Sequence, residues 1–475
     1  MARDTWYRLD NVGKFYSSEA GSSFQTVFRF SATFVDDVDE LALQHATEKA
    51  VSFFPNFNVC LRNGMFWHYL ESASRPPTIS HENLPICFGL HVDTKSVLFR
   101  VSYYQRRVNL EVSHMVSDGR GTMSFFKALL SSYAQERYGI EGPFLDYDGS
   151  DFQKSEDSFD KYYERGKRAL EPEGPEELSP VQKGKVYRLS GWRDAADPTY
   201  LEYHLPSEEV LSLARSYGVS VTSLICAAII CAIRAEMPFR ARQRTIRISI
   251  PVDLRQAFGS TTTNNFFGLT FVSYTPTSDE PVEKVAAQIH SQLAHVAQAK
   301  QLKPRMNRMI SLEKSPFLRY APLFIKDLVI LWASRIAARD ATLTVSNLGQ
   351  IRVDERLAPF LTDINILIST TGLNLSICSL GGDLSIGIST IFSNLGVVKH
   401  FCRFFSSQGI KGHINSNKAH ADGAAGRSEH RHEPPSERPG SKADGHDKDD
   451  AKGVAKGAAT GDATGDAVIE REGQQ

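Results

Sequence analysis

A histidine loop constrains this chain more than any other feature, because it lies between a strand pattern and a helix pattern. The loop reads His114-Met115-Val116-Ser117-Asp118-Gly119. Before it, apolar residues alternate over 97–101 and 108–112, which is typical of two strands joined by a short turn. After it, apolar residues between 125 and 133 recur at spacings of three and four, which predicts a helix. We therefore expect His114 to be held between two rigid elements.

His114 has the chemistry of a general base. Imidazole titrates near neutrality, so a neutral ring can accept a proton from a hydroxyl, amine or thiol that attacks a carbonyl. Asp118 would orient the ring or brace the loop, and Gly119 would allow a backbone conformation or a close approach that a Cβ atom forbids. A structural histidine is the alternative, since the chain contains 14 histidines. The residue types alone do not separate these interpretations.

The His-x-x-x-Asp-Gly string resembles the active-site motif of the chloramphenicol-acetyltransferase-like superfamily. That group includes alcohol acetyltransferases, BAHD acyltransferases, wax ester synthases and condensation domains. Three later segments agree with the resemblance in order and separation: 250–255 resembles the arginine segment of the second lobe, 265–268 a strand start, and 344–349 a late loop. The opening at 6–11 is similar to the start of alcohol-acetyltransferase-like proteins. The resemblance covers roughly residues 5–410.

Two differences from the superfamily's patterns narrow the choice among its branches. Condensation domains usually carry two adjacent histidines before the spacer, whereas here Ser113 precedes His114, which favours a stand-alone enzyme over an assembly-line module. The Asp-Phe-Gly-Trp-Gly segment of plant BAHD enzymes is not found in the sequence. The alcohol-acetyltransferase-like branch therefore fits best.

The resemblance implies an α/β fold of two similar lobes, each a mixed β-sheet flanked by helices, with an active-site tunnel between them. An acyl-CoA would serve as co-substrate and a small alcohol or amine as acceptor, with an acyl carrier protein as another possible donor. His114 would take the proton of the acceptor as it attacks the thioester. No resident cofactor and no metal are expected. Because such a chain completes its site by itself, we expect a monomer.

The resemblance also implies roles around the histidine. Asp118 would form a bidentate ion pair with Arg255 across the fold, and Gly119 would permit the turn. The tetrahedral oxyanion needs hydrogen-bond donors, for which Ser346 and Asn347 are the candidates. Asn347 could equally cap its own turn. Asn265 is the alternative donor or a loop brace.

Length and composition bound the domain organisation. At 475 residues the chain is too long for one compact core, which predicts two lobes. We expect an N-terminal lobe at 1–140, a charged crossover linker at 141–198 and a C-terminal lobe at 199–410. The remainder, 411–475, has almost no large apolar side chains and is expected to be disordered. Its scattered histidines lack the regular spacing of a metal site.

Charge, cysteines and hydropathy exclude several classes. The net charge of −1 argues against a nucleic-acid-binding surface. The six cysteines show no metal-binding spacing and lie mostly in apolar runs, which indicates buried thiols in a reducing compartment. The polar start predicts no signal peptide, and the apolar run at 321–333 is interrupted by Lys326 and Asp327, so it fails as a membrane span. A cytoplasmic location is expected.

Other enzyme classes lack their motifs. The sequence contains neither the Gly-x-Ser-x-Gly of serine hydrolases nor the His-Glu-x-x-His of metalloproteases, and no phosphate-loop or dinucleotide signature. Two alternatives stay open beside O-acyl transfer. One is amide-forming condensation from a carrier protein, and the other is a non-catalytic relative that acts as a binding or scaffold protein.

The remaining patterns predict a regular α/β alternation. Ser207 is the expected N-cap of a helix, and a fully buried helix is expected at 222–237. A hairpin turn is expected at 62–64. The other predicted strands are 24–35, 57–61, 65–70, 201–205, 245–250, 266–274, 341–346, 364–369, 373–379 and 384–390, and the other predicted helices are 38–53, 160–170 in part, 282–299, 317–338 and 395–405.

Overall fold

The computed structural model describes residues 6–22, 24–74, 77–142, 156–165, 185–276, 278–296, 299–314 and 321–418. All of these residues belong to one compact unit, Met1–Ala419. Much of the linker predicted at 141–198, and the tail from residue 419 onward, lie outside the described residues.

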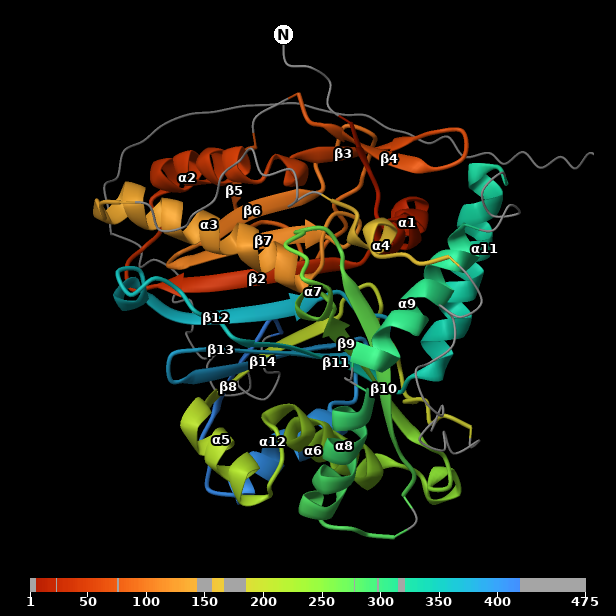
Figure 1. Ribbon diagram of the computed structural model, residues 1–475. Helices are drawn as coiled ribbons and strands as arrows, with labels where there is room; N and C mark the ends of the chain where they lie inside the picture. Colours follow the sequence, from red (N-terminus) through yellow and green to blue (C-terminus); the bar gives the residue numbers. More distant parts are fainter. Residues whose placement is uncertain are drawn as a thin grey trace, which may run out of the picture. The chain divides into compact units, whose positions relative to one another are not determined.

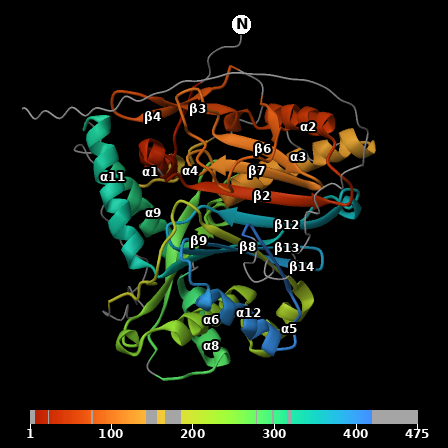
Figure 2. The same ribbon diagram turned by 180° about the vertical axis from the view of Figure 1, so that it is seen from behind.

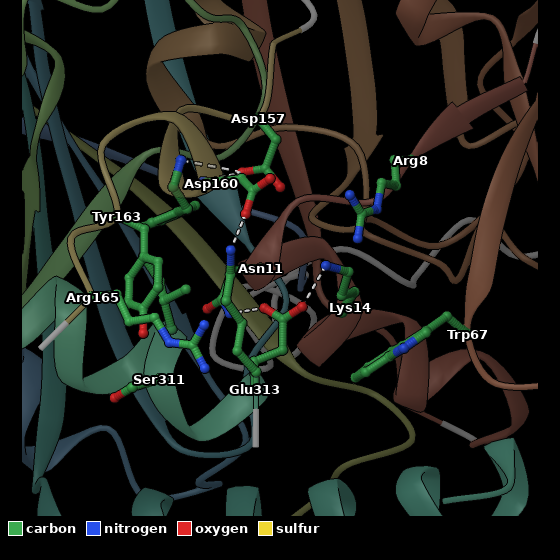
Figure 3. Close-up of a pocket in the computed structure, with 13 residues that line it drawn as sticks. Arg8, Asn11, Lys14, Trp67, Asp157, Asp160, Tyr163, Arg165, Ser311 and Glu313 are labelled. Carbon is green, nitrogen blue, oxygen red and sulfur yellow. Dashed lines mark hydrogen bonds and ion pairs between the residues drawn. The ribbon is translucent and has the colours of Figure 1, made fainter. Parts of the chain in front are cut away.

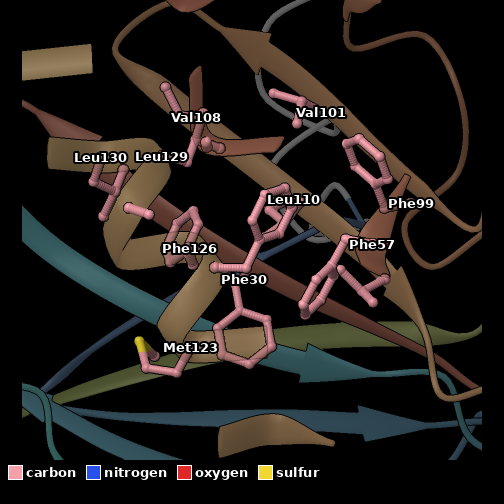
Figure 4. Packing of buried hydrophobic residues seen from close by; sticks show 14 of the residues in the cluster. Phe30, Phe57, Phe99, Val101, Val108, Leu110, Met123, Phe126, Leu129 and Leu130 are labelled. Carbon is pink, nitrogen blue, oxygen red and sulfur yellow. The ribbon is translucent and has the colours of Figure 1, made fainter. Parts of the chain in front are cut away.

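The first half of the chain forms a five-stranded sheet with two helices packed side by side over one face (Figure 1). In spatial order the strands are β12 (Leu361–Ile368), β2 (Val27–Phe34), β7 (Arg107–Ser113), β6 (Phe99–Tyr104) and β5 (Ile79–His81), and the helices are α2 (Glu40–Phe53) and α3 (Gly119–Tyr138). Figure 4 shows Phe126 and Leu129 of α3 packed against Phe30 and Leu110 of the sheet, which are all fully buried. This core fixes the end of β7, from which the histidine loop begins.

A three-stranded sheet and a short helix complete this half. The strands are β1 (Trp6–Arg8), β4 (His68–Ser72) and β3 (Val59–Asn63), and the helix is α1 (Asn11–Ser17), which continues into a 3-10 turn, η1 (Ser18–Gly21). The predicted hairpin is confirmed, but its turn lies at 64–67 and not at 62–64: Arg62 and Asn63 are paired in β3, and Gly64 N donates to Trp67 O at 3.0 Å.

The second half forms a seven-stranded sheet whose outer face is covered by helices (Figure 2). Its strands are β10 (Phe267–Tyr274), β9 (Ile246–Asp253), β11 (Leu343–Gln350), β13 (Leu373–Leu380), β14 (Asp383–Thr390), β8 (Thr199–Pro206) and β15 (His413–Ser416), and the helices are α5 (Ser207–Ser216), α6 (Val221–Glu236), α8 (Val282–Val296) and α12 (Gly396–Ser407). Helix α6 is apolar nearly all round and lies at the centre of this core, as predicted.

The faces of the two sheets without helices pack against each other. Strand β12 contacts β13 and β14, and Asn365 Nδ2 donates to Ser385 Oγ at 2.5 Å. A Cβ atom on Gly387 would lie 2.0 Å from Ile366 O, so only glycine allows this approach. The predicted fold class of two α/β lobes is confirmed. The sequence did not indicate that β12, a strand of the second half, would pair with β2 of the first.

Several local predictions were wrong. Pro206 holds the N-cap position of α5, and Ser207 is its first residue, with no side-chain capping bond. Helix α9 (Ala299–Glu313) was missed because most of its residues are polar and Pro304 lies inside it, although Leu302, Met306 and Ile310 form a buried apolar stripe. Helix α1 was missed because seven residues give almost no periodicity. Helix α11 covers Leu323–Ala337, and the linker contains only the short helix α4 (Ser158–Lys161) within its described part.

The remaining compositional predictions concern membranes and thiols. Among the described residues, no single helix is long and apolar enough to cross a membrane; α5 and α6 reach that length only together, across a bend of 83°. All six cysteines are free thiols, and the four at positions 60, 87, 226 and 378 are buried.

Candidate active site

His114 lies directly after β7, in a pocket of aromatic rings. Its backbone N donates to Thr26 O at 2.9 Å, and the residue is only 4% exposed. The Tyr16 ring from α1 stacks on the imidazole with 4.1 Å between centroids and 16° between planes. Phe28 and Phe267 close in at 4.5 and 5.5 Å. Side chains from β2, α1 and β10 therefore surround the imidazole ring.

The hydrogen bonds of Asn265 fix the tautomer of this histidine. Asn265 Nδ2 lies 3.1 Å from His114 O and 3.1 Å from Asp10 Oδ2. A backbone carbonyl can only accept, so the atom facing it is the amide nitrogen, and Oδ1 faces His114 Nδ1 at 2.9 Å. Because Oδ1 accepts, Nδ1 carries the hydrogen. The lone pair of the neutral ring is therefore on Nε2.

The electrostatics keep the ring neutral. Burial lowers the pKa of His114 to about 4, although the charge of Asp118 and the bond to Asn265 both favour the protonated form. At pH 7 the imidazole is thus almost entirely uncharged. Within the described part of the chain, no hydrogen bond to Nε2 is present. The ring has the protonation state and the free acceptor that a general base needs.

Asp10 is a residue of this site that the sequence analysis missed. Its Oδ1 accepts from Gly13 N at 2.6 Å, so it caps helix α1, and its Oδ2 accepts from Asn265 N at 2.9 Å. Burial, with the nearby charge of Asp157, raises the pKa of this carboxyl to about 7. An acidic residue just before a helix was the available signal, but α1 itself was too short to predict. Helix α1 therefore contacts both site residues: Asp10 at its N-cap binds Asn265, and Tyr16 stacks on His114.

The predicted ion pair between Asp118 and Arg255 is confirmed, but its geometry differs. One pair of atoms, Arg255 Nη2 and Asp118 Oδ1, makes the contact at 2.9 Å, so the expected bidentate arrangement is wrong. The other N–H groups of Arg255 donate to Thr262 O, Asn264 O and Asp253 Oδ1 at 2.7 to 2.9 Å. Arg255 therefore holds its own loop together, and its N–H donors are divided between that loop and Asp118.

Asp118 joins three elements through one buried carboxylate. Its Oδ1 accepts from the backbone of Arg120 and Gly121 and so caps α3, while its Oδ2 accepts from Phe266 N at 2.8 Å. Burial raises the pKa of this carboxyl, but the charge of Arg255 and these hydrogen bonds outweigh burial and hold the pKa below its usual value. Asp118 is ionised at neutral pH and positions the loop; it makes no hydrogen bond to the imidazole among the described contacts.

The glycine that the loop requires is not the predicted one. Gly119 does not have a positive φ, and a Cβ atom there would meet only the Leu348 side chain, at 3.3 Å. A Cβ atom on Gly121 would lie 1.9 Å from Thr263 O and 2.3 Å from Ser117 Oγ. The close approach therefore occurs two residues later, in the first turn of α3, against Thr263 of the second half.

The late-loop candidates lie on strand β11. Asn347 Oδ1 accepts from Gly349 N at 2.7 Å and its Nδ2 donates to Thr222 Oγ1 at 2.8 Å, so it caps its own bulge and binds α6. Ser346 alternates with Val345, which packs in the helix-covered core, so Ser346 is on the face toward the first half. Asn265 uses both amide N–H bonds, as described above, which makes it a brace.

A polar cavity of about 710 Å³ lies beside α1 (Figure 3). Lys14 and Asn11 of α1 line it, and Lys14 Nζ pairs with Glu313 at 2.6 Å. His114 does not line this cavity, so the tunnel at the imidazole stays a prediction. Among the described residues, no group of His, Cys, Asp and Glu is arranged to hold a metal ion.

Known proteins resemble this chain in part of its sequence and in its fold. Residues 205–357 match the family model for the C-terminus of phthiocerol/phthiodiolone dimycocerosyl transferase, which is about a third of the chain. No curated protein sequence matches the chain. Polyketide synthase associated protein 5 from Mycobacterium tuberculosis has a similar structure, with a TM-score of 0.56 and 14% identity over 84% of this chain and 96% of that one.

Two further structures are similar. The first condensation domain of the calcium-dependent antibiotic synthetase has a TM-score of 0.58 and 15% identity, over 85% of this chain and 96% of that one. TRI101 from F. sporotrichioides, in complex with coenzyme A and T-2, has a TM-score of 0.56 and 11% identity, over 86% and 99%. The chain has the fold of the chloramphenicol-acetyltransferase-like superfamily. These similarities show the fold alone, and the roles of individual residues in this chain stay predictions.

The Asp118 network gives a stability prediction. In Asp118→Asn, the new Nδ2 donor would face either Phe266 N–H or the Arg255 guanidinium, both donors, so we expect the free energy of unfolding to fall by about 3 kcal/mol. Asp253→Asn is the matched control, because Asp253 binds the same arginine but its side chain is 31% exposed; a loss of about 1 kcal/mol or less is expected there. Denaturant unfolding measures both. Equal losses in the two variants would contradict the conclusion that Asp118 contributes more to stability than Asp253.

Proposed function

We propose that this protein is an O-acyltransferase that moves an acyl group from acyl-CoA to a hydroxyl acceptor, with His114 as general base. The observation that carries the proposal is the neutral, anchored imidazole: Nδ1–H is held by Asn265 at 2.9 Å, and the Nε2 lone pair is uncommitted among the described contacts. The coenzyme A in the TRI101 complex, a protein of the same fold, supports a thioester donor.

The proposed reaction needs one proton carrier. His114 Nε2 removes the hydroxyl proton as the acceptor oxygen attacks the thioester carbonyl carbon, which gives a tetrahedral oxyanion and an imidazolium. The oxyanion collapses, the C–S bond breaks, and the thiolate takes the proton from Nε2. An ester and free CoA leave, and the imidazole is neutral again. No acyl-enzyme forms, so the histidine is base and then acid in one cycle.

Other residues have positioning or stabilising roles in this proposal. Asn265 and Asp10 hold the tautomer, and the Asp118–Arg255 pair holds the loop. Ser346 is the proposed hydrogen-bond donor to the oxyanion, because its strand face is directed toward the first half and its hydroxyl is not part of a bulge cap. Asn347 is less suited, since its amide already binds Thr222 and Gly349.

Condensation from a carrier protein is the second candidate. The similarity to a condensation domain favours it, and Ser113 in place of a second histidine disfavours it. The two candidates share the base and differ in donor and acceptor. A scaffold protein without turnover is the third, and it predicts no dependence of any transfer on His114.

Replacement of the base tests the proposal directly. In His114→Ala, we expect acceptor-dependent thiol release from acyl-CoA to fall by about 10²- to 10⁴-fold, the usual contribution of a general base. The assay uses short- and long-chain acyl-CoAs with a panel of alcohols and amines. Transfer to amines from a carrier-bound thioester, with none from acyl-CoA, would favour condensation. Equal rates in both proteins with every donor would leave the scaffold alternative.

The pH profile tests the electrostatics. Because burial lowers the pKa of His114 to about 4, kcat/KM should stay level through pH 6.5, where an ordinary imidazole becomes protonated, and fall only as the pH nears 4. Circular dichroism at each pH checks that the fold persists. Asp10→Asn is the control, since burial raises the pKa of Asp10 to about 7. A decline near neutrality that persists in this variant would contradict the low pKa.

Loss of the brace should act through the histidine. In Asn265→Ala, His114 Nδ1–H and the Asp10 carboxyl lose a buried partner, and we expect kcat to fall by about 10- to 100-fold with a smaller change in KM. Asn264→Ala is the matched control: it alters the adjacent asparagine but keeps the backbone O that accepts from Arg255 at 2.7 Å. A larger kcat loss in the control than in Asn265→Ala would exclude the tautomer role.

A further inference from the structure

Helix α11 exposes its apolar side to solvent. Phe324, Leu328 and Trp332 follow each other at four-residue spacing and are 73%, 70% and 66% exposed. Ile325, Val329 and Ile336 flank them on the same side at 38–42% exposure. Four-residue spacing places these side chains in one stripe along the helix. We call the six residues the α11 stripe. In Figures 1 and 2 the helix stands at one edge of the molecule beside β4 and α9.

Lys326 and Asp327 of this helix point the other way. Lys326 is 1% exposed; its Nζ donates to Phe66 O at 2.7 Å and lies 3.7 Å from the ring centroid of Trp67. Asp327 pairs with His68 at 3.2 Å. These are the two charges that interrupt the apolar run in the sequence, and both are turned toward the protein. The apolar side of this helix therefore faces solvent and the side with Lys326 and Asp327 faces the protein, which is the opposite of a helix that packs in a core.

The apolar surface continues onto a neighbouring hairpin. Met65, at the β3–β4 turn, is 78% exposed, and its backbone O accepts from Leu323 N at 3.4 Å. Phe66 beside it is 39% exposed. Exposed apolar side chains gathered in this way mark an interaction surface and not the scattered exposure of an ordinary monomer.

The charges around the stripe favour an anionic partner. Residues 299–340 contain nine Lys or Arg and three Asp or Glu, whereas the whole chain has 54 and 55. Of the three acids, Glu313 forms an ion pair with Lys14, and Asp327 faces the His68 ring. Lys303 and Lys314 pair with acids at 164 and 160, and the segment still carries more cations than acids. A symmetric contact between two copies would bring these basic segments together, which like-charge repulsion opposes.

We propose that the α11 stripe and Met65 dock on an anionic lipid surface, with α11 lying in the plane of the interface. Trp, Phe, Leu and Ile on one face, with basic residues nearby, are the side chains of interfacial helices. Helix α11 also packs on η1, which follows α1, the helix whose Tyr16 covers His114. Docking would bring membrane-dissolved acyl donors or acceptors to that side of the site; this last step alone rests on the proposed function.

Vesicle flotation of the full chain tests docking. Wild-type protein should float with vesicles of phosphatidylcholine and about one-third phosphatidylglycerol, and far less with phosphatidylcholine alone. Leu328→Asp should bind at least about tenfold more weakly, because a charge replaces a leucine that docking would bury. Leu41→Asp is the matched control, since Leu41 lies on α2 and is equally exposed, at 72%. It should bind as the wild type does.

Other results would overturn the proposal. Equal loss in Leu328→Asp and Leu41→Asp, or equal flotation with both vesicle types, would exclude an anionic lipid surface at α11. Failure to float, together with a wild-type dimer that Leu328→Asp converts to a monomer in sedimentation equilibrium, would assign the stripe to a second copy. Thiol release from a water-soluble acyl-CoA without vesicles should be the same in Leu328→Asp and wild type. That assay judges the proposed reaction independently of docking.

Discussion

The site depends on the buried carboxylate of Asp118. Its two oxygens bind the first turn of α3, the guanidinium of Arg255 and the first N–H of the segment that becomes β10. These groups come from both halves of the chain, since Arg255 and Phe266 lie 137 and 148 residues after Asp118. A buried charge is costly unless every lone pair has a partner, and here the arginine and three backbone N–H groups supply partners. The histidine loop is therefore fixed by the same contacts that join the halves.

Asn265, the residue just before Phe266, connects this network to the orientation of the histidine ring. Its amide bridges Asp10, His114 and the backbone of His114, so three segments distant in sequence determine which ring nitrogen carries hydrogen. Each segment is held independently: Asp10 by capping α1, His114 by following β7, Asn265 by preceding β10. The tautomer is a property of the assembled fold and not of the motif. This explains why the same short motif can be read in a sequence without revealing how its histidine is oriented.

The features that could be predicted from the sequence were either local elements of secondary structure or contacts implied by the resemblance. Strand β7 and helix α3 follow from periodicity, and the buried helix α6 follows from its apolar run. The Asp118–Arg255 pair came from the superfamily, but its single contact could not be foreseen, because the competing acceptors Thr262 O and Asn264 O depend on how the loop folds back. The brace role of Asn265 and the role of Asp10 depend on tertiary hydrogen bonds. For α11, the sequence indicated a helix with an interrupted apolar run, but Trp67 and His68 decide which side turns inward.

Burial of His114 has opposite effects on the two proton transfers that the proposed reaction requires. A ring whose pKa lies near 4 is a weaker base than an ordinary imidazole, which slows removal of the hydroxyl proton. The imidazolium that results is a correspondingly stronger acid, while an alkyl thiolate has a pKa of about 8.5, so the return of the proton to the leaving group is strongly favourable. The same dry surroundings also keep the ring unprotonated before the substrate arrives. Aromatic enclosure therefore weakens the base in the attack step and strengthens the acid in the departure step, so it favours collapse of the tetrahedral oxyanion over its formation.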